Sequence, residues 1–123
     1  MIVVDEQISY PGILAAIGHW YPGTVLSVRD FKPHGRILDP EIPGYLLQLR
    51  QPTFVTINYG HFPPDEFRHA RYCIVRFKLK DEEAREVPEL LRALLRQPEF
   101  DSKAKRMGKV ISWTKTQISY VER

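Results

Sequence analysis

The chain has 123 residues, of which 43% are hydrophobic and 27% charged, and this composition is typical of a globular domain. Its 18 Lys and Arg residues against 15 Asp and Glu residues give a net charge of +3, which allows a polyanionic partner without requiring one. Short apolar runs, an acidic start and one cysteine argue against disorder, secretion, a coiled coil and a membrane span. We expect one cytoplasmic domain over residues 1–123.

Three short strands and two helices are predicted over the first half of the chain. The strands are the apolar or β-branched runs Ile2–Val4, Thr24–Val28 and Thr53–Ile57. A first helix is predicted from Pro11 to the stop at Tyr21-Pro22-Gly23. A second helix is predicted near Asp39, which precedes a proline as an N-cap would, although Pro43 leaves open whether the regular helix begins only there.

The second half predicts a strand, a helix and a hairpin. Apolar and polar residues alternate over Tyr72–Leu79, as in a strand. Asp81 has the position of a helix cap, and Pro88 either kinks that helix or marks its start. Val110–Trp113 and Gln117–Val121 form a closing β-hairpin. This alternation predicts an α/β fold with a mostly parallel sheet, right-handed crossovers and a C-terminal β-hairpin at one edge.

Polar side chains follow the ends of several predicted strands. Asp5 and Glu6 come directly after the first strand, and Asn58 follows the third. Asp39 and Glu41 open the helical segment before the third strand. Because open α/β sheets bind ligands beyond the carboxyl ends of their strands, we expect these side chains to meet at one edge. Such hard oxygen ligands suit Mg²⁺ or Mn²⁺.

Each of these residues also has a purely structural interpretation. Asp5 could mark the point where a strand reaches solvent, and Asp39 could serve only as a helix N-cap. Asn58 could be a turn residue and His61 a surface loop residue. Cys73 lies on the apolar face of a predicted strand, so we expect a core thiol rather than a nucleophile.

Several short motifs resemble those of the small bacterial PIN-like domains. They are Val4-Asp5-Glu6, Val28-Arg29-Asp30-Phe31, Asp39-Pro40-Glu41-Ile42, the segment 55–62 and Gly108-Lys109-Val110-Ile111. The resemblance covers nearly the whole chain and implies a single three-layer α/β/α PIN-like domain. That family includes VapC-type toxin ribonucleases, which hold Mg²⁺ or Mn²⁺ on an acidic cluster and hydrolyse RNA.

The resemblance implies a set of site residues. Asp5 matches the acid that ends the family's first strand, and Asp39 or Glu41 matches the acid that opens its middle helix. The implied catalytic residues are Asp5, Asp39, Glu41 and Asn58, and the implied metal ligands are Asp5, Glu6, Asp39 and Asn58. For the RNA backbone the candidates are Arg76, Lys78, Lys103, Lys105 and Arg106, whose alternative role is an ordinary solvated surface.

The sequence departs from the family after the third strand. Thr56 and Phe62 match the family pattern, but Asn58 and His61 stand where carboxylates are common. Two hypotheses follow. The chain is a metal-dependent ribonuclease, expected to pair with an antitoxin protein and to form a homodimer, or it is a degenerate PIN-like module that binds RNA or a protein without cleavage. No membrane association is expected.

Overall fold

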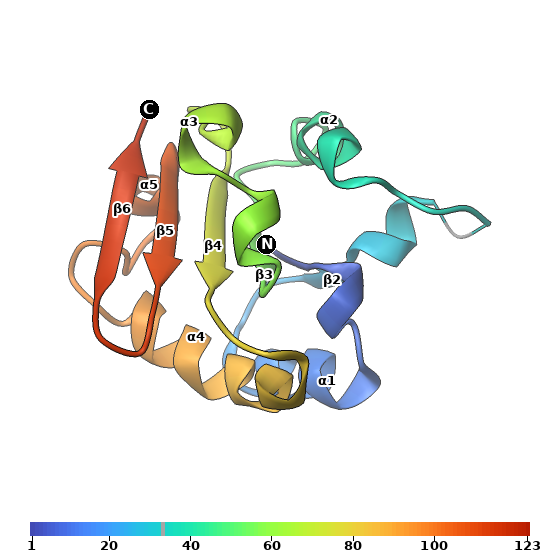
Figure 1. Ribbon diagram of the computed structural model, residues 1–123, viewed down its shortest axis with the longest axis horizontal. Helices are drawn as coiled ribbons and strands as arrows, with labels where there is room; N and C mark the ends of the chain where they lie inside the picture. The colour runs from blue at the N-terminus through green and yellow to red at the C-terminus, as the bar shows by residue number, and fades with distance from the viewer. Residues whose placement is uncertain (33) are drawn as a thin grey trace.

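The computed structural model of the protein describes residues 1–32 and 34–123 and contains a six-stranded sheet in the order β2-β1-β3-β4-β5-β6 (Figure 1). The strands are β1 (Ile2–Val4), β2 (Val25–Ser27), β3 (Thr53–Thr56), β4 (Cys73–Phe77), β5 (Lys109–Trp113) and β6 (Ile118–Glu122). Strands β1 to β5 pair in parallel, and β6 runs antiparallel to β5. The predicted mostly parallel α/β fold with a C-terminal hairpin is therefore confirmed.

Helical segments connect the strands. The α-helices are α1 (Pro11–Trp20), α2 (Ile42–Leu46), α3 (Pro64–Phe67), α4 (Val87–Leu95) and α5 (Lys103–Arg106). The 3₁₀ segments are η1 (Glu6–Ile8), η2 (Val28–Phe31), η3 (Asp39–Glu41), η4 (Tyr59–His61) and η5 (Asp81–Glu86). Three of the ten segments, η1, η2 and η4, are separated from the preceding strand by at most two residues. They place polar side chains beyond the strand ends.

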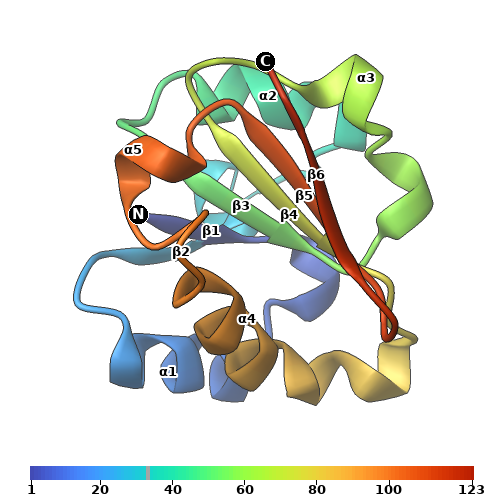
Figure 2. The ribbon, with the colours of Figure 1, turned by 90° about the vertical axis from the view of Figure 1, so that its left-hand side faces the viewer.

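Both faces of the sheet are buried, because successive residues of a strand point to opposite faces. Ile2 and Val4 belong to a hydrophobic cluster that includes α1 and α4, whereas Val3 belongs to a second cluster that includes α2 and α3. The same alternation separates Val75 from Ile74 in β4. Figures 1 and 2 show α1 and α4 on one side of the sheet and α2 and α3 on the other.

The connection from β4 to β5 has the opposite hand to the connection from β3 to β4. Both step in the same direction across the sheet, but α3 packs in one hydrophobic cluster and α4 in the other. The expectation of right-handed crossovers throughout is therefore wrong. Helix α4 lies beside α1, where Leu91 and Leu94 help to cover the face formed by Val75 and Phe77 and remove it from water.

Prolines set the starts of the helices more reliably than acids do. Pro11 begins α1 and Pro88 lies at the start of α4, as expected from a residue that needs no hydrogen-bonding partner for its nitrogen. The predicted N-caps are wrong. Asp39 is the first residue of η3 and its carboxylate makes no cap, while Lys80 rather than Asp81 precedes η5. Pro43 lies at the start of α2, one of the two alternatives left open.

The order of the strands reverses at β1. The chain leaves β1 for β2 on one side and then returns to β3 on the other side. Helix α1, between β1 and β2, and helix α2, between β2 and β3, pack in different clusters and hence on opposite faces. In such sheets the two connections diverge at the reversal, and a crevice opens beyond the carboxyl ends of the two strands. Here that crevice lies beyond β1 and β3.

Candidate functional site at the carboxyl ends of β1 and β3

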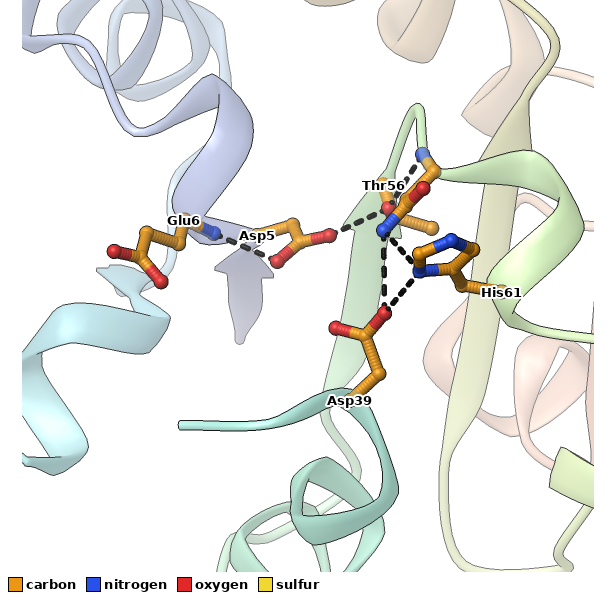
Figure 3. A network of polar contacts seen from close by, with 6 residues as sticks. Asp5, Glu6, Asp39, Thr56 and His61 are labelled. Carbon is orange, nitrogen blue, oxygen red and sulfur yellow. Dashed lines mark hydrogen bonds and ion pairs between the residues drawn. The ribbon is translucent and has the colours of Figure 1, made fainter. Parts of the chain in front are cut away.

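Asp5 joins the ends of β1 and β3. Its backbone N–H donates to the carbonyl of Val55 at 2.9 Å, which fixes the residue beside β3. One carboxylate oxygen accepts from the backbone N–H of Glu6 at 2.7 Å, and the other accepts from the hydroxyl of Thr56 at 2.6 Å (Figure 3). Asp5 is 5% exposed, so the strand does not simply reach solvent there. Two hydrogen bonds hold this buried carboxylate in one orientation.

The electrostatic surroundings of Asp5 disfavour its ionised form. Burial raises the pKa of its carboxyl above the ordinary value of 3.8, and the negative charges of Asp39 and Glu6 raise it further. The hydrogen bonds from Thr56 and from the backbone of Glu6 act in the opposite direction. A cation beside Asp5 would offset both the burial and the repulsion from Asp39.

Asp39, Asn58 and His61 form a second polar group next to Asp5 (Figure 3). Nδ2 of Asn58 lies 3.2 Å from Oδ2 of Asp39, and Nδ1 of His61 lies 2.7 Å from the same oxygen. The two nitrogens are 2.8 Å apart because both converge on one acceptor. A proton on Nδ1 lets both nitrogens donate to Asp39, and the other ring nitrogen, Nε2, is then the basic one.

Thr56 links the two groups. Its hydroxyl donates to Asp5 and accepts from the backbone N–H of Asn58 at 2.9 Å. The turn after β3 is therefore attached to the end of β1, and η4 follows at once with His61 at its last position. The structure thus brings together Asp5, Asp39, Asn58 and His61, although they come from three segments far apart in the sequence.

A cavity of about 920 Å³ contains this site. The residues that line it are Asp5, Glu6, Gln7, Tyr10, Arg29, Arg36, Leu38, Asp39, Pro40, Asn58, His61, Glu66 and Phe67. The lining includes the carboxylates of Asp5, Glu6, Asp39 and Glu66, and the guanidinium groups of Arg29 and Arg36 supply positive charge. A site with these groups can hold a cation and an anionic substrate together.

The structure separates Glu6 from Glu41. Glu6 lines the cavity, and its carboxylate lies 4.0 Å from the guanidinium of Arg29. Glu41 is exposed and is not among the described residues that line the cavity, because α2 begins at Ile42 and turns the chain away. Of the two acids considered for the opening of the middle helix, only Asp39 lies at the site.

The basic residues predicted to hold RNA do not form one surface. Arg76 and Lys78 lie at the carboxyl end of β4, whereas Lys103, Lys105 and Arg106 lie on α5, which precedes β5 and hence sits at the amino end of the sheet. The three residues of α5 are therefore at the opposite edge from the acidic cavity.

Three of these basic side chains have structural contacts. Nζ of Lys105 donates to the carbonyl of Pro98 at 3.1 Å and to Asp101 at 2.9 Å. The guanidinium of Arg76 donates to Ser112 Oγ at 2.7 Å and to the carbonyl of Tyr59 at 3.0 Å, and it lies 3.9 Å from the centre of the Tyr59 ring. Arg106 is 5% exposed and donates to the carbonyl of Phe100 at 2.8 Å. Arg106 therefore has little surface to offer to an RNA backbone outside the protein. Lys78 is exposed.

Other side chains at the site had weaker signals in the sequence. His61 follows the third strand and departs from the family pattern, but its contact with Asp39 joins two segments that no local spacing relates. Arg29 is the second residue after β2 and could have been found from its position beyond a strand end. Cys73 is buried in the first hydrophobic cluster, and burial raises the pKa of its thiol to about 12, so the expected core thiol is confirmed.

No family model matches the chain, and no curated protein or solved structure matches it either. Within residues 1–32 and 34–123, no three His, Cys, Asp or Glu side chains are grouped so that they could hold a metal ion. Over the same described residues, no helix is long and apolar enough to cross a membrane.

Proposed function

We propose that the chain is a PIN-like domain with three α/β/α layers that hydrolyses RNA with the help of Mg²⁺ or Mn²⁺. One observation carries the proposal. Asp5 and Asp39, from segments 34 residues apart, meet with Asn58 in one cavity at the reversal of the strand order. Ligands of open α/β sheets bind in this position.

The residues at the site fit a magnesium or manganese ion. Mg²⁺ is usually held by one or two carboxylates together with waters and substrate phosphate, so a full cage of protein ligands is not required. Asp5 and Asp39 supply two carboxylates, and Asn58 supplies an amide. A bound divalent cation would neutralise phosphate charge and make a water molecule more acidic. Burial of Asp5 beside the charge of Asp39 favours cation binding at this position.

The chain's own residues would act on the substrate as follows. Arg29 and Arg36 bind the phosphates on the wall of the cavity. His61, held by Asp39, accepts the proton of the attacking water at Nε2. The water oxygen bonds to phosphorus, the bond from phosphorus to one ester oxygen breaks, and that oxygen takes up a proton from bulk water, to which His61 later returns the proton it accepted. Asn58 and Thr56 hold the carboxylates in place.

The proposed activity implies partners. The substrate is RNA, and Lys78, exposed at the carboxyl end of β4, would add an electrostatic contact to its backbone. By its resemblance to toxin ribonucleases, the chain would act in the cytoplasm as a homodimer and would be inhibited by a small antitoxin protein.

A second function is favoured by the hydrogen-bonding partners of one atom, Oδ2 of Asp39. Oδ2 of Asp39 already accepts from both Asn58 and His61, two residues that stand where the family often has carboxylates. These contacts stabilise Asp39 without a metal ion. The alternative is therefore a PIN-like module that binds RNA or a partner protein at this cavity and does not cleave.

A calorimetric titration with Mn²⁺ and a labelled-RNA cleavage assay on the same preparations separate the two functions. We expect the native chain to bind Mn²⁺ and to cleave RNA slowly, and Asp5→Asn to lose both properties. Glu41→Gln, which removes an exposed carboxylate outside the cavity, is the matched control and should behave as the native chain. RNA binding without Mn²⁺ binding or cleavage would favour the module.

A further inference from the structure

A second cavity, of about 540 Å³, lies at the opposite end of the sheet from the acidic site. It is formed by the turn Tyr21–Gly23 before β2, the end of α4 around Arg92 and Arg96, and the start of α5 at Lys103. Figure 2 shows α5 and the end of α4 on the side of the sheet where the amino ends of the strands lie. No residue of this cavity takes part in the proposed hydrolysis.

The charge of this cavity is strongly positive. Four basic residues line it, namely Arg92, Arg96, Lys103 and Arg106, against one carboxylate, Asp101. That carboxylate accepts from the ammonium group of Lys105 at 2.9 Å, so its charge is largely offset by a residue outside the lining. Arg92, Arg96 and Lys103 are exposed. Several positive groups thus face one cavity without an equal number of acids.

Two buried donors in the lining lack acceptors. Among the described residues, the only buried side-chain nitrogen or oxygen atoms without a hydrogen-bonding partner are Nε1 of Trp20 and Nε of Arg106. Both residues line this cavity. Arg106 is 5% exposed and its Nη1 donates to the carbonyl of Phe100, which holds the guanidinium in place. Buried donors normally find an acceptor, so the wall of this cavity keeps two polar groups unsatisfied.

We propose that this cavity binds the phosphate group of a phosphate monoester. A phosphate has several acceptor oxygens and about two negative charges, which match the excess of arginine and lysine in the lining. The planar guanidinium of Arg106, fixed at the inner wall, would contact the phosphate, and Arg96 and Lys103 would close over it from the rim. The ligand is thus held by its phosphate end, and the site does not depend on the proposed nuclease activity.

Isothermal titration of the full chain with inorganic phosphate and with adenosine 5′-monophosphate tests this proposal. Both ligands are expected to bind with a stoichiometry of one, and a sodium chloride series at equal ionic strength is expected to give no binding heat. Equal affinity for the two ligands means that the phosphate alone is recognised, and tighter binding of the nucleotide means that the Trp20 region contributes as well. Either result supports the site. Binding of neither ligand overturns it.

Variants at the rim avoid the risk that loss of the buried Arg106 unfolds the protein. Arg96→Gln and Lys103→Gln should each weaken phosphate affinity by about tenfold, the loss of one charge-assisted hydrogen bond. Arg50→Gln, which removes an exposed arginine outside the cavity, is the matched control and should change the affinity by less than about twofold. Equal weakening by all three variants would show a general charge effect and overturn the proposal.

One further variant separates this site from the proposed function. Asp5→Asn should leave phosphate affinity unchanged while it removes Mn²⁺ binding, because Asp5 lies in the other cavity. Failure of the nuclease proposal would leave this result intact. If Asp5→Asn instead abolishes phosphate binding, the ligand sits at the acidic site and the second cavity is not the binding site.

Discussion

Nδ1 of His61 lies 2.7 Å from Oδ2 of Asp39, although the two residues are 22 positions apart and belong to different loops. The contact orients the ring, and in the tautomer with a proton on Nδ1 it leaves Nε2 free to accept a proton. A histidine held by a carboxylate in a cavity is suited to transfer a proton. His61 therefore adds to the cavity a group with proton-transfer chemistry of its own.

His61→Gln is expected to lower kcat for RNA cleavage by about 10²–10⁴-fold, the usual contribution of a general base. KM should change little, because the side chain is proposed to move a proton and not to bind the backbone. The rate–pH profile should lose one limb. His19→Gln, at an exposed position on α1, is the matched control. A parallel loss in both variants, or an unchanged pH profile, would show that His61 only supports the loop.

Asp5→Asn is expected to stabilise the fold at pH 7. Burial raises the pKa of Asp5 in the folded state above the unfolded value of 3.8, so the folded state binds the proton more tightly. The free energy of unfolding therefore falls as the pH rises from below 3.8 through the folded pKa. Asparagine carries no charge at pH 7, so the variant avoids the free energy needed to hold an ionised carboxylate at this buried position. Thermal unfolding should show a higher Tm for Asp5→Asn at pH 7 and similar Tm values for the two proteins below pH 3.8.

Asp30→Ala removes a carboxylate that stabilises the fold, and its Tm is to be compared with that of Asp5→Asn. The carboxylate of Asp30 accepts from the backbone N–H of Ser27 at 2.9 Å and completes a capping box at η2. Its loss should destabilise the protein by about 1 kcal/mol at pH 7, as for other caps. If Asp5→Asn destabilises in the same way, Asp5 is a structural residue and not one strained for function.

Arg76 and Lys78 should behave differently, although both were predicted to bind RNA. Arg76→Gln loses the contacts to Ser112 and Tyr59 and should lower stability by about 1–3 kcal/mol, measured by denaturant unfolding. Lys78→Gln should leave stability unchanged but reduce the slope of log affinity for single-stranded RNA against log salt by about 0.7. An unchanged salt slope for Lys78→Gln would remove this residue from the RNA surface.

Asn58→Asp should make the thermal stability of the protein depend on the metal ion. The new carboxylate would lie beside Oδ2 of Asp39, where Asn58 now donates at 3.2 Å, so the metal-free variant should have a lower Tm than the native chain. Mn²⁺ should raise this Tm more than it raises that of the native chain, and calorimetry should show tighter binding. Equal Mn²⁺ responses in the two proteins would mean that no ion binds next to Asn58.

The residue composition and the hydrophobic pattern of the sequence were sufficient to predict where the strands lie. Each strand contains β-branched or aromatic residues bounded by polar or turn residues, and all six predicted strands overlap the observed ones, the ends differing by a few residues. The hand of the last parallel connection could not be predicted, because it depends on α4 packing beside α1 rather than on any local signal. The short helices α3 and α5 carry too few residues to show a period.

The site was predictable where a residue directly follows a strand. Asp5 and Asn58 were found in this way, and both lie in the cavity. The sequence could not separate Asp39 from Glu41, which both lie near the start of the middle helix, and in the structure only Asp39 lines the cavity. It also could not show that Arg106 is buried, because this depends on the tertiary contact with the carbonyl of Phe100. Contacts between loops, such as that of His61 with Asp39, depend on tertiary structure alone.

Cleavage of a labelled single-stranded RNA by the purified chain, with Mn²⁺, with EDTA, and with Mn²⁺ restored after EDTA, tests the proposed function most directly. The account predicts slow cleavage with Mn²⁺, no cleavage with EDTA, recovery when Mn²⁺ is restored, no activity for Asp5→Asn and native activity for Glu41→Gln. Cleavage that persists in EDTA or in Asp5→Asn, or no cleavage by the native chain at any Mn²⁺ concentration, would contradict it.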